Sequence, residues 1–198
     1  VKVLVDTGFL PLASILIEPA KILFLNNAIN FGVLAPIGAV EAAETGKSIM
    51  FMLESNPGPG LGLLVAFWLA GPKLLRGSAP GAIVIHFLGG IHEIYFPYVL
   101  LKPIVVLAAI AGGATGVATF AATGVGLVAT PSPGSIFAYM AMTPPGNHFG
   151  VLLGIALSAA VSFVVAFFIL KATRAGDDAA DLDASKAKSK AMKTGDAA

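Results

Sequence analysis

The chain has 198 residues, of which 57% are hydrophobic and only 12% are Asp, Glu, Lys or Arg, about half the charged share that is usual in a soluble domain. This composition argues against a soluble domain, a disordered chain and a nucleic-acid-binding protein. The chain has no cysteine, which excludes disulfides, thiolate metal sites and a cysteine nucleophile within it. The net charge of +1 indicates no particular partner.

The first apolar stretch, Phe9–Ile17, is short and is expected to end at Glu18-Pro19. Three asparagines follow it, at Asn26, Asn27 and Asn30. In a helix, Asn26 and Asn30 would share one face because they are four residues apart. Amides in a membrane helix bond either to a neighbouring helix or to a polar ligand, and the sequence leaves both roles open.

A turn is predicted at Asn56-Pro-Gly-Pro-Gly60, because proline and glycine interrupt regular structure there. This turn places Glu54 and Asn56 at a helix end, and by itself it is a signal of low specificity. The apolar stretch Leu61–Ala70 follows and ends at Gly71-Pro72.

The stretch Ile83–Leu101 is apolar but is interrupted by Gly89-Gly90 and Pro97, with His92 and Glu93 between them. Interrupted stretches of this kind form short spans or re-entrant segments, and broken helices are tolerated at membrane depth where they line a cavity. A carboxylate near the bilayer centre costs at least ~2.5–3.5 kcal/mol. Glu93 is therefore expected to face a cavity or a partner, the alternative being a helix-end carboxylate that reaches water at the interface.

Two continuous membrane spans are predicted, at Pro103–Ala129 and Phe149–Leu170, because no charged residue occurs from position 103 to position 170. The second would be ~33 Å long as a helix, against a hydrocarbon core of ~30 Å. Gly112 and Gly116 in the first form a G-x-x-x-G pattern, for which helix packing is favoured over a dimer face. The proline-rich segment Thr130–His148 is predicted to be a loop or hairpin tip.

Lys171 and Arg174 follow the second span at once and indicate a cytoplasmic C-terminal end. From residue 175 onward, acidic residues precede basic ones and no large apolar face exists, which is typical of a solvated linker or a frayed helix. We therefore expect a membrane domain over residues 1–174 and a cytoplasmic linker over residues 175–198. Val1 is not methionine, and the sequence is expected to start inside a longer protein.

The polar residues within the apolar segments indicate what chemistry the chain can perform. The three histidines lack the spacing of a metal site, and no nucleotide-binding glycine pattern or hydrolase triad is present, so neither a metal nor a cofactor is expected. The chemistry that remains is recognition of a polar, uncharged solute. Carboxylates, amides and an imidazole suit a polyol, because together they both donate to and accept from hydroxyl groups.

Several motifs in this order resemble the mannitol-specific IIC membrane domains of the bacterial phosphotransferase system. The motifs are Glu18–Asn30, Glu54 with Asn56–Gly60, Gly89–Leu100 (Gly-Gly-Ile-His-Glu-Ile-Tyr-Phe-Pro-Tyr-Val-Leu) and Ser132–Ser135. The resemblance covers the chain from about Leu10 to Arg174.

The resemblance implies an all-α, polytopic integral membrane protein with transmembrane helices and re-entrant, broken-helix hairpins. It also implies a homodimer in the bacterial inner membrane that binds mannitol and moves it across the bilayer. A cytoplasmic IIB domain then phosphorylates the sugar from a phosphocysteine, giving mannitol 1-phosphate. The Gly-Ile-x-Glu motif contacts substrate in the wider superfamily, so Glu93 and His92 are the first candidates for substrate binding. The further candidates are Asn26, Asn27 and Asn30, followed by Glu54 and Asn56.

The chain departs from the family pattern in three ways. Phe31 stands where the family often has histidine, which leaves the choice of hexitol open. By the same resemblance we expect the sequence to lack the N-terminal half of a IIC domain and to stop in the linker before IIB. Without the phosphocysteine this polypeptide alone could not complete phosphotransfer and would hold no catalytic residue, so whether it counts as an enzyme stays open. The alternatives are a phosphorylation-independent transporter or channel for another polar solute, a permease for another hexitol, and a fragment without function.

Overall fold

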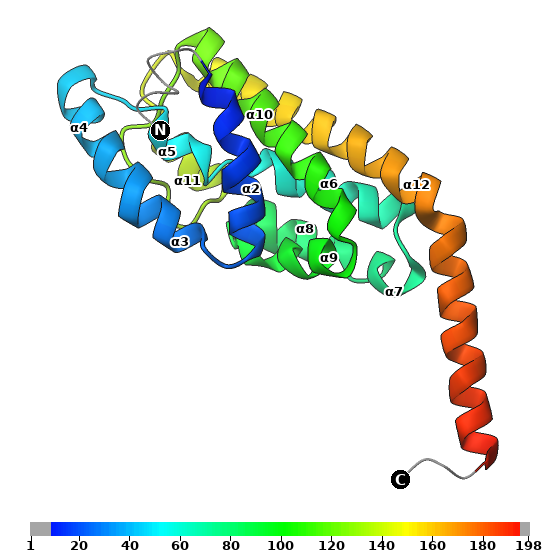
Figure 1. Cartoon of the computed structure of the whole chain (residues 1–198). Helices are drawn as coiled ribbons and strands as arrows, with labels where there is room; N and C mark the ends of the chain where they lie inside the picture. The colour runs from blue at the N-terminus through cyan, green and yellow to red at the C-terminus, as the bar shows by residue number, and fades with distance from the viewer. Residues whose placement is uncertain (1–8, 195–198) are drawn as a thin grey trace.

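The structure is a computed structural model that describes residues 9–194, with side chains described up to residue 173. Across this part of the chain the secondary structure is helical, without a named strand. The all-α fold predicted from the sequence is therefore confirmed. Figure 1 shows a bundle in which α10 (Val106–Thr123) runs beside α12 (His148–Thr194), and the C-terminal part of α12 projects beyond the other helices.

The remaining elements are short. In chain order they are η1 (Leu10–Ala13), α2 (Ser14–Ile22), α3 (Asn26–Ile29), η2 (Asn30–Leu34), α4 (Ala35–Thr45), α5 (Met50–Leu53), α6 (Gly58–Ala70), α7 (Lys73–Arg76), α8 (Ala79–Ile83), η3 (Val84–Leu88), η4 (His92–Tyr95), α9 (Phe96–Leu101), η5 (Pro103–Val105) and α11 (Ile136–Ala141). Of the η elements, η2 and η3 are π-helical and the others are 3₁₀.

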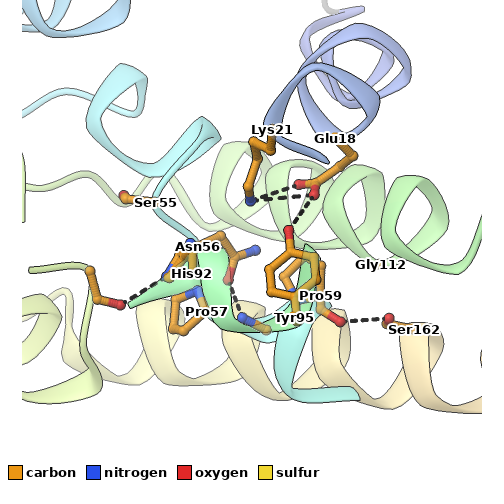
Figure 2. Close-up of polar contacts among 12 residues, drawn as sticks. Glu18, Lys21, Ser55, Asn56, Pro57, Pro59, His92, Tyr95, Gly112 and Ser162 are labelled. Carbon is orange, nitrogen blue, oxygen red and sulfur yellow. Dashed lines mark hydrogen bonds and ion pairs between the residues drawn. The ribbon is translucent and has the colours of Figure 1, made fainter. Parts of the chain in front are cut away.

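Helices α6, α10 and α12 pack closely because small residues face one another across their contacts. A Cβ on Gly112 of α10 would lie 2.7 Å from the Ser158 carbonyl oxygen of α12. The Ser158 hydroxyl donates to the Gly112 carbonyl at 2.8 Å. The Ser162 hydroxyl donates to the Pro59 carbonyl at 2.7 Å (Figure 2). Gly112 thus serves packing within this chain, as the sequence favoured, and each buried serine has a partner.

Among the residues that the structure describes, two helices are long and apolar enough to cross a membrane, at Pro103–Thr123 and His148–Thr173. They correspond to the two predicted spans, with one boundary that the sequence placed wrongly. The first helix ends at Thr123 and not at Ala129, because Gly124 adopts a left-handed conformation (φ 62°) and closes the helix. Leu127 then forms an antiparallel bridge with Ser48.

Helix α2 continues past the end of the first apolar stretch at Glu18-Pro19 and reaches Ile22, and Glu18 and Lys21 in this part of the helix are both buried and paired. One local prediction was wrong. The segment predicted as a loop before His148 contains α11, which begins because the Ser135 side chain accepts from the Ala138 amide at 3.1 Å. His148 itself opens α12.

The interrupted stretch at residues 83–101 is broken as predicted. The π turn η3 ends at Leu88, three residues without helical structure follow, and η4 and α9 complete the segment. Gly90 has φ 76°, a conformation that side chains with a Cβ rarely adopt. A similar break separates α2 from α3, where Phe24 has φ 61°. These breaks bring polar side chains to one place in the interior.

Candidate functional site

A cavity of about 150 Å³ lies where four broken segments meet. Its walls come from the α3–η2 turn, the residues after α5, the start of η4 and the loop before α11. The lining residues are Asn26, Asn27, Asn30, Phe31, Glu54, Ser55, Gly90, His92, Glu93, Pro131, Ser132, Pro133 and Gly134.

The asparagines reach the cavity because the chain passes directly from α3 into the π turn η2. Asn26 and Asn30 are buried, at 7% and 6% exposure, whereas Asn27 is exposed. The Asn26 amide donates to Glu93 Oε1 at 2.7 Å, although the two residues are 67 positions apart in the sequence. This bond fixes the Glu93 carboxylate against the asparagine wall.

His92 and Glu93 stand on the 3₁₀ turn η4, which begins after the left-handed Gly90. The Nε2 atom of His92 lies 3.1 Å from the carbonyl oxygen of Gly134 (Figure 2). A Cβ on Gly90 would lie 2.5 Å from the Ser135 amide nitrogen, so only glycine allows this approach. The two loops that carry these residues therefore close one side of the cavity by direct backbone contact.

Glu54 and Ser55 enter from the end of α5, as the turn signal predicted. Both are buried, at 6% and 3% exposure. The Ser55 hydroxyl donates to the Phe51 carbonyl and lies 2.8 Å from the Tyr139 hydroxyl, which anchors this wall to α11. The sequence placed Glu54 at a helix end but did not single out Ser55.

Asn56 is not among the lining residues. Its Oδ1 atom accepts from the Gly58 amide at 2.9 Å, and its Nδ2 atom donates to the Ser158 hydroxyl at 3.2 Å. Asn56 thus bonds to the first residue of α6 and connects this helix to α12, as Figure 2 shows for the first of these contacts. Its side chain has a complete structural role away from the cavity.

A buried ion pair lies on α2, just before the asparagines. The Lys21 ammonium is 3.3 and 3.4 Å from the two Glu18 carboxylate oxygens, and both side chains are at most 1% exposed. The Tyr95 hydroxyl donates to Glu18 at 3.5 Å, so the pair also contacts the turn that carries His92 and Glu93 (Figure 2). An i,i+3 pair on a helix usually forms at the surface, and the sequence carried no signal that this one is buried.

The cavity is also lined by residues that the sequence did not indicate as binding residues: Phe31, Gly90 and the loop Pro131–Gly134. The loop belongs to one of the motifs that carry the family resemblance, which was the available signal. His86, by contrast, is fully buried behind the site, where its Nε2 atom lies 2.9 Å from the Pro57 carbonyl and its ring centroid lies 4.6 Å from that of His92.

The chemistry of the lining fits a small neutral solute with hydroxyl groups. It offers two carboxylates, three amides and two serine hydroxyls, and it includes neither lysine nor arginine. Among the residues that the structure describes, no group of three His, Asp or Glu side chains could hold a metal ion. Hydrogen bonding to hydroxyls is the interaction that these side chains share.

Residues 8–113 match the family described as phosphotransferase system, EIIC. The match covers more than half of the chain and includes nine of the thirteen residues that line the cavity. The chain belongs to the EIIC family. As a member of this family it is an integral membrane protein, in agreement with its two apolar helices.

Similar proteins extend the match along the chain. The chain is 62% identical over 178 residues to the PTS system mannitol-specific EIICB component of Geobacillus stearothermophilus, which covers 90% of this chain and 38% of that protein. It is 57% identical over 193 residues to the component of the same name in Bacillus subtilis, covering 98% and 40%. The mannitol-specific cryptic EIICB component of Escherichia coli K12 is 56% identical over 171 residues, covering 86% and 37%.

This EIIC chain therefore spans about two fifths of the length of these relatives. No solved structure matches it significantly. The resemblance to mannitol-specific IIC domains that the sequence motifs indicated is confirmed by these relatives.

Proposed function

We propose that this EIIC chain is the transport part of a mannitol permease, which binds mannitol and moves it across the membrane coupled to its phosphorylation to mannitol 1-phosphate. One observation carries the proposal: six of the seven residues selected from the sequence line a single cavity. They are Asn26, Asn27, Asn30, Glu54, His92 and Glu93.

The polar walls suit the hydroxyl groups of a hexitol. Each carboxylate oxygen of Glu54 and Glu93 can accept from a hydroxyl, and the asparagine amides can both donate and accept. Such bonds are stronger in a cavity from which most water is excluded, and leaving one unmade is costly. A hexitol that offers hydroxyls along its whole length could satisfy these walls, whereas an apolar solute would leave them unpaired.

The phosphoryl donor would be a IIB partner domain. Relatives that are more than half identical are named EIICB components, which places a IIB part in those proteins. The chain described here has no cysteine, so the phosphocysteine must come from elsewhere. The role of this chain is then to hold the hexitol and present a hydroxyl group, without supplying a catalytic nucleophile.

The placement of the chain in the cell follows from the same proposal. Residues 1–174 would form the membrane domain in the bacterial inner membrane, with the broken segments as re-entrant hairpins. Residues 175–198 would lead toward IIB in the cytoplasm, in keeping with Lys171 and Arg174 at the membrane boundary. Because the backbone of α12 continues to Thr194, this connection would be largely a rigid helix. A homodimer within the lipid bilayer completes the proposed assembly.

Mannitol binding tests the proposal. We would measure it by flow dialysis on membranes that hold the chain, and on a chimera in which the chain replaces the matching part of the Bacillus subtilis relative. Glu93→Gln should weaken binding at least tenfold in the chimera, since it replaces a charged acceptor by a neutral one. Glu44→Gln, on the exposed face of α4, is the matched control and should leave affinity unchanged. Wild-type affinity in Glu93→Gln would contradict the site.

A permease for another hexitol is the second candidate, and Phe31 favours it. Its phenyl ring lines the cavity and offers no hydrogen bond. Competition of sorbitol and galactitol against mannitol in the same assay would decide the substrate. If sorbitol or galactitol bound more tightly than mannitol, that hexitol would be assigned as the substrate, and the assignment of the binding residues would stay the same.

A further inference from the structure

The cavity lining has an unbalanced charge. Glu54 and Glu93 contribute two carboxylates, and no lysine or arginine stands among the lining residues. His92, the remaining ionisable residue of the lining, directs its Nε2 atom at the Gly134 carbonyl oxygen. Burial raises the pKa of Glu54 to about 7, so this carboxyl group is only partly ionised near neutral pH. The cavity still presents carboxylate groups without a cation to whatever occupies it.

The lysine on the neighbouring helix is not available to offset this charge. Lys21 is fully buried, and its ammonium group lies against both carboxylate oxygens of Glu18. Figure 2 shows this pair above Tyr95, with the two side chains turned toward each other. Because Glu18 neutralises Lys21, the pair together adds no net positive charge beside the cavity.

The start of α6 does not provide an anion site either. The N-terminus of a helix commonly binds phosphate through its unpaired backbone N–H groups. Here Pro57 and Pro59 have no N–H, and the Gly58 N–H donates to the Asn56 side chain at 2.9 Å. The sequence of this turn thus removes three of the backbone donors that a phosphate group would use at a helix start, those of residues 57, 58 and 59.

We propose that Glu54 and Glu93 make the cavity selective for an uncharged solute and expel the phosphorylated product by charge repulsion. This inference rests on the proposed function. In that reaction the S–P bond of the IIB phosphocysteine breaks, an O–P bond forms at a hexitol hydroxyl, the hydroxyl proton passes to water and a thiolate remains. The hexitol thereby gains a charge of about −1.5 to −2 while it is still beside two carboxylates.

The size of the effect follows from Coulomb's law. One negative charge about 7 Å from a carboxylate is disfavoured roughly 50-fold at an effective dielectric constant of about 20. Solvent and ions reduce this factor at the open side of the cavity. We therefore expect an ionised carboxylate to weaken binding of the phosphorylated product at least tenfold relative to the neutral hexitol. Glu54 should contribute less than this near neutral pH, because burial raises its pKa to about 7 and it can take up a proton.

The test compares ligands of graded charge in the chimera with the Bacillus subtilis relative. Competition against radiolabelled mannitol would be measured for mannitol 1-acetate, mannitol 1-sulfate and mannitol 1-phosphate. We expect affinity to fall stepwise from the neutral ester to the monoanion to the dianion, by at least 100-fold in total. Since the acetate also adds bulk at the same carbon, it separates a charge effect from a steric one.

Two variants locate the effect. Glu93→Gln should narrow the ratio of mannitol to mannitol 1-phosphate affinity at least tenfold. Glu54→Gln should narrow it by less at neutral pH and by more at higher pH, where Glu54 is ionised. Glu44→Gln should not change the ratio. The ratio is used because loss of a hydroxyl contact shared by both ligands cancels in it. The inference would be overturned if mannitol 1-acetate and mannitol 1-phosphate bound equally weakly. It would also be overturned if neither variant changed the ratio of mannitol to mannitol 1-phosphate affinity. In both cases binding of mannitol itself would still support the proposed function. Absence of binding by any hexitol would instead overturn the proposed function, and the inference with it.

Discussion

The bond between Asn26 and Glu93 allows a quantitative test of how the site is organised. The Asn26 amide lies 2.7 Å from Glu93 Oε1, and Asn26 is only 7% exposed. A hydrogen bond from a neutral donor to a charged acceptor contributes about 1.5–3 kcal/mol. If this bond holds the Glu93 carboxylate in place for the hexitol, Asn26→Leu should weaken mannitol binding about 10- to 150-fold.

A double-mutant cycle distinguishes this role from a separate contact of Asn26 with the ligand. Flow dialysis would give mannitol affinity for Asn26→Leu, Glu93→Gln and the double variant in the chimera. Residues coupled by a direct bond show an interaction energy of about 0.5–3 kcal/mol, so the double variant should lose less than the sum of the two losses. Strictly additive losses, with unchanged thermal stability in all three variants, would refute the argument that Asn26 positions Glu93.

Three further predictions concern the surroundings of the site. Gly90→Ala should lower the melting temperature and abolish mannitol binding, because residue 90 has φ 76° and the added Cβ would collide with the Ser135 backbone. Gly77→Ala is the control and should do neither, because there is open space around Gly77. Lys21→Met should destabilise the protein by about 3–5 kcal/mol in denaturant titration, since Glu18 is left buried and unpaired, and adding Glu18→Gln should recover most of the loss. Phe31→His should strengthen mannitol binding several-fold in flow dialysis, as one net hydrogen bond of about 1 kcal/mol would predict, without a change in melting temperature.

Local sequence patterns predicted the helical fold well because they depend on neighbouring residues. The uncharged stretch before Lys171 predicted the long helix α12, and the glycine pair at Gly89-Gly90 predicted the break before η4. The end of α10 was misplaced by six residues because apolar composition continues past Gly124, whereas the helix closes where that glycine turns left-handed. Apolar composition indicates which segments lie in a membrane, but it does not indicate the backbone conformation that ends a helix.

The positions of Glu54 and Asn56 show what local sequence patterns could not predict. Both residues belong to the same short motif and both are polar within apolar surroundings. Glu54 lines the cavity, but Asn56 turns to the Gly58 amide and the Ser158 hydroxyl. The difference depends on a serine 102 positions away, which no local pattern in the motif contains.

The sequence by itself determined that this chain is helical, lies in a membrane and carries polar groups at a few interrupted positions, because those properties follow from composition and from neighbours along the chain. Only the tertiary structure decided that Asn26 contacts Glu93 and that Glu18 and Lys21 are paired in the interior. It also decided that Glu54 and Glu93 line one cavity whose walls contain neither lysine nor arginine. The Asn26–Glu93 bond and the cavity walls join segments far apart in sequence, and the burial of the Glu18–Lys21 pair depends on the distant elements packed around α2, such as Tyr95 of η4. Charge balance in a buried site is a property of the groups that folding brings together.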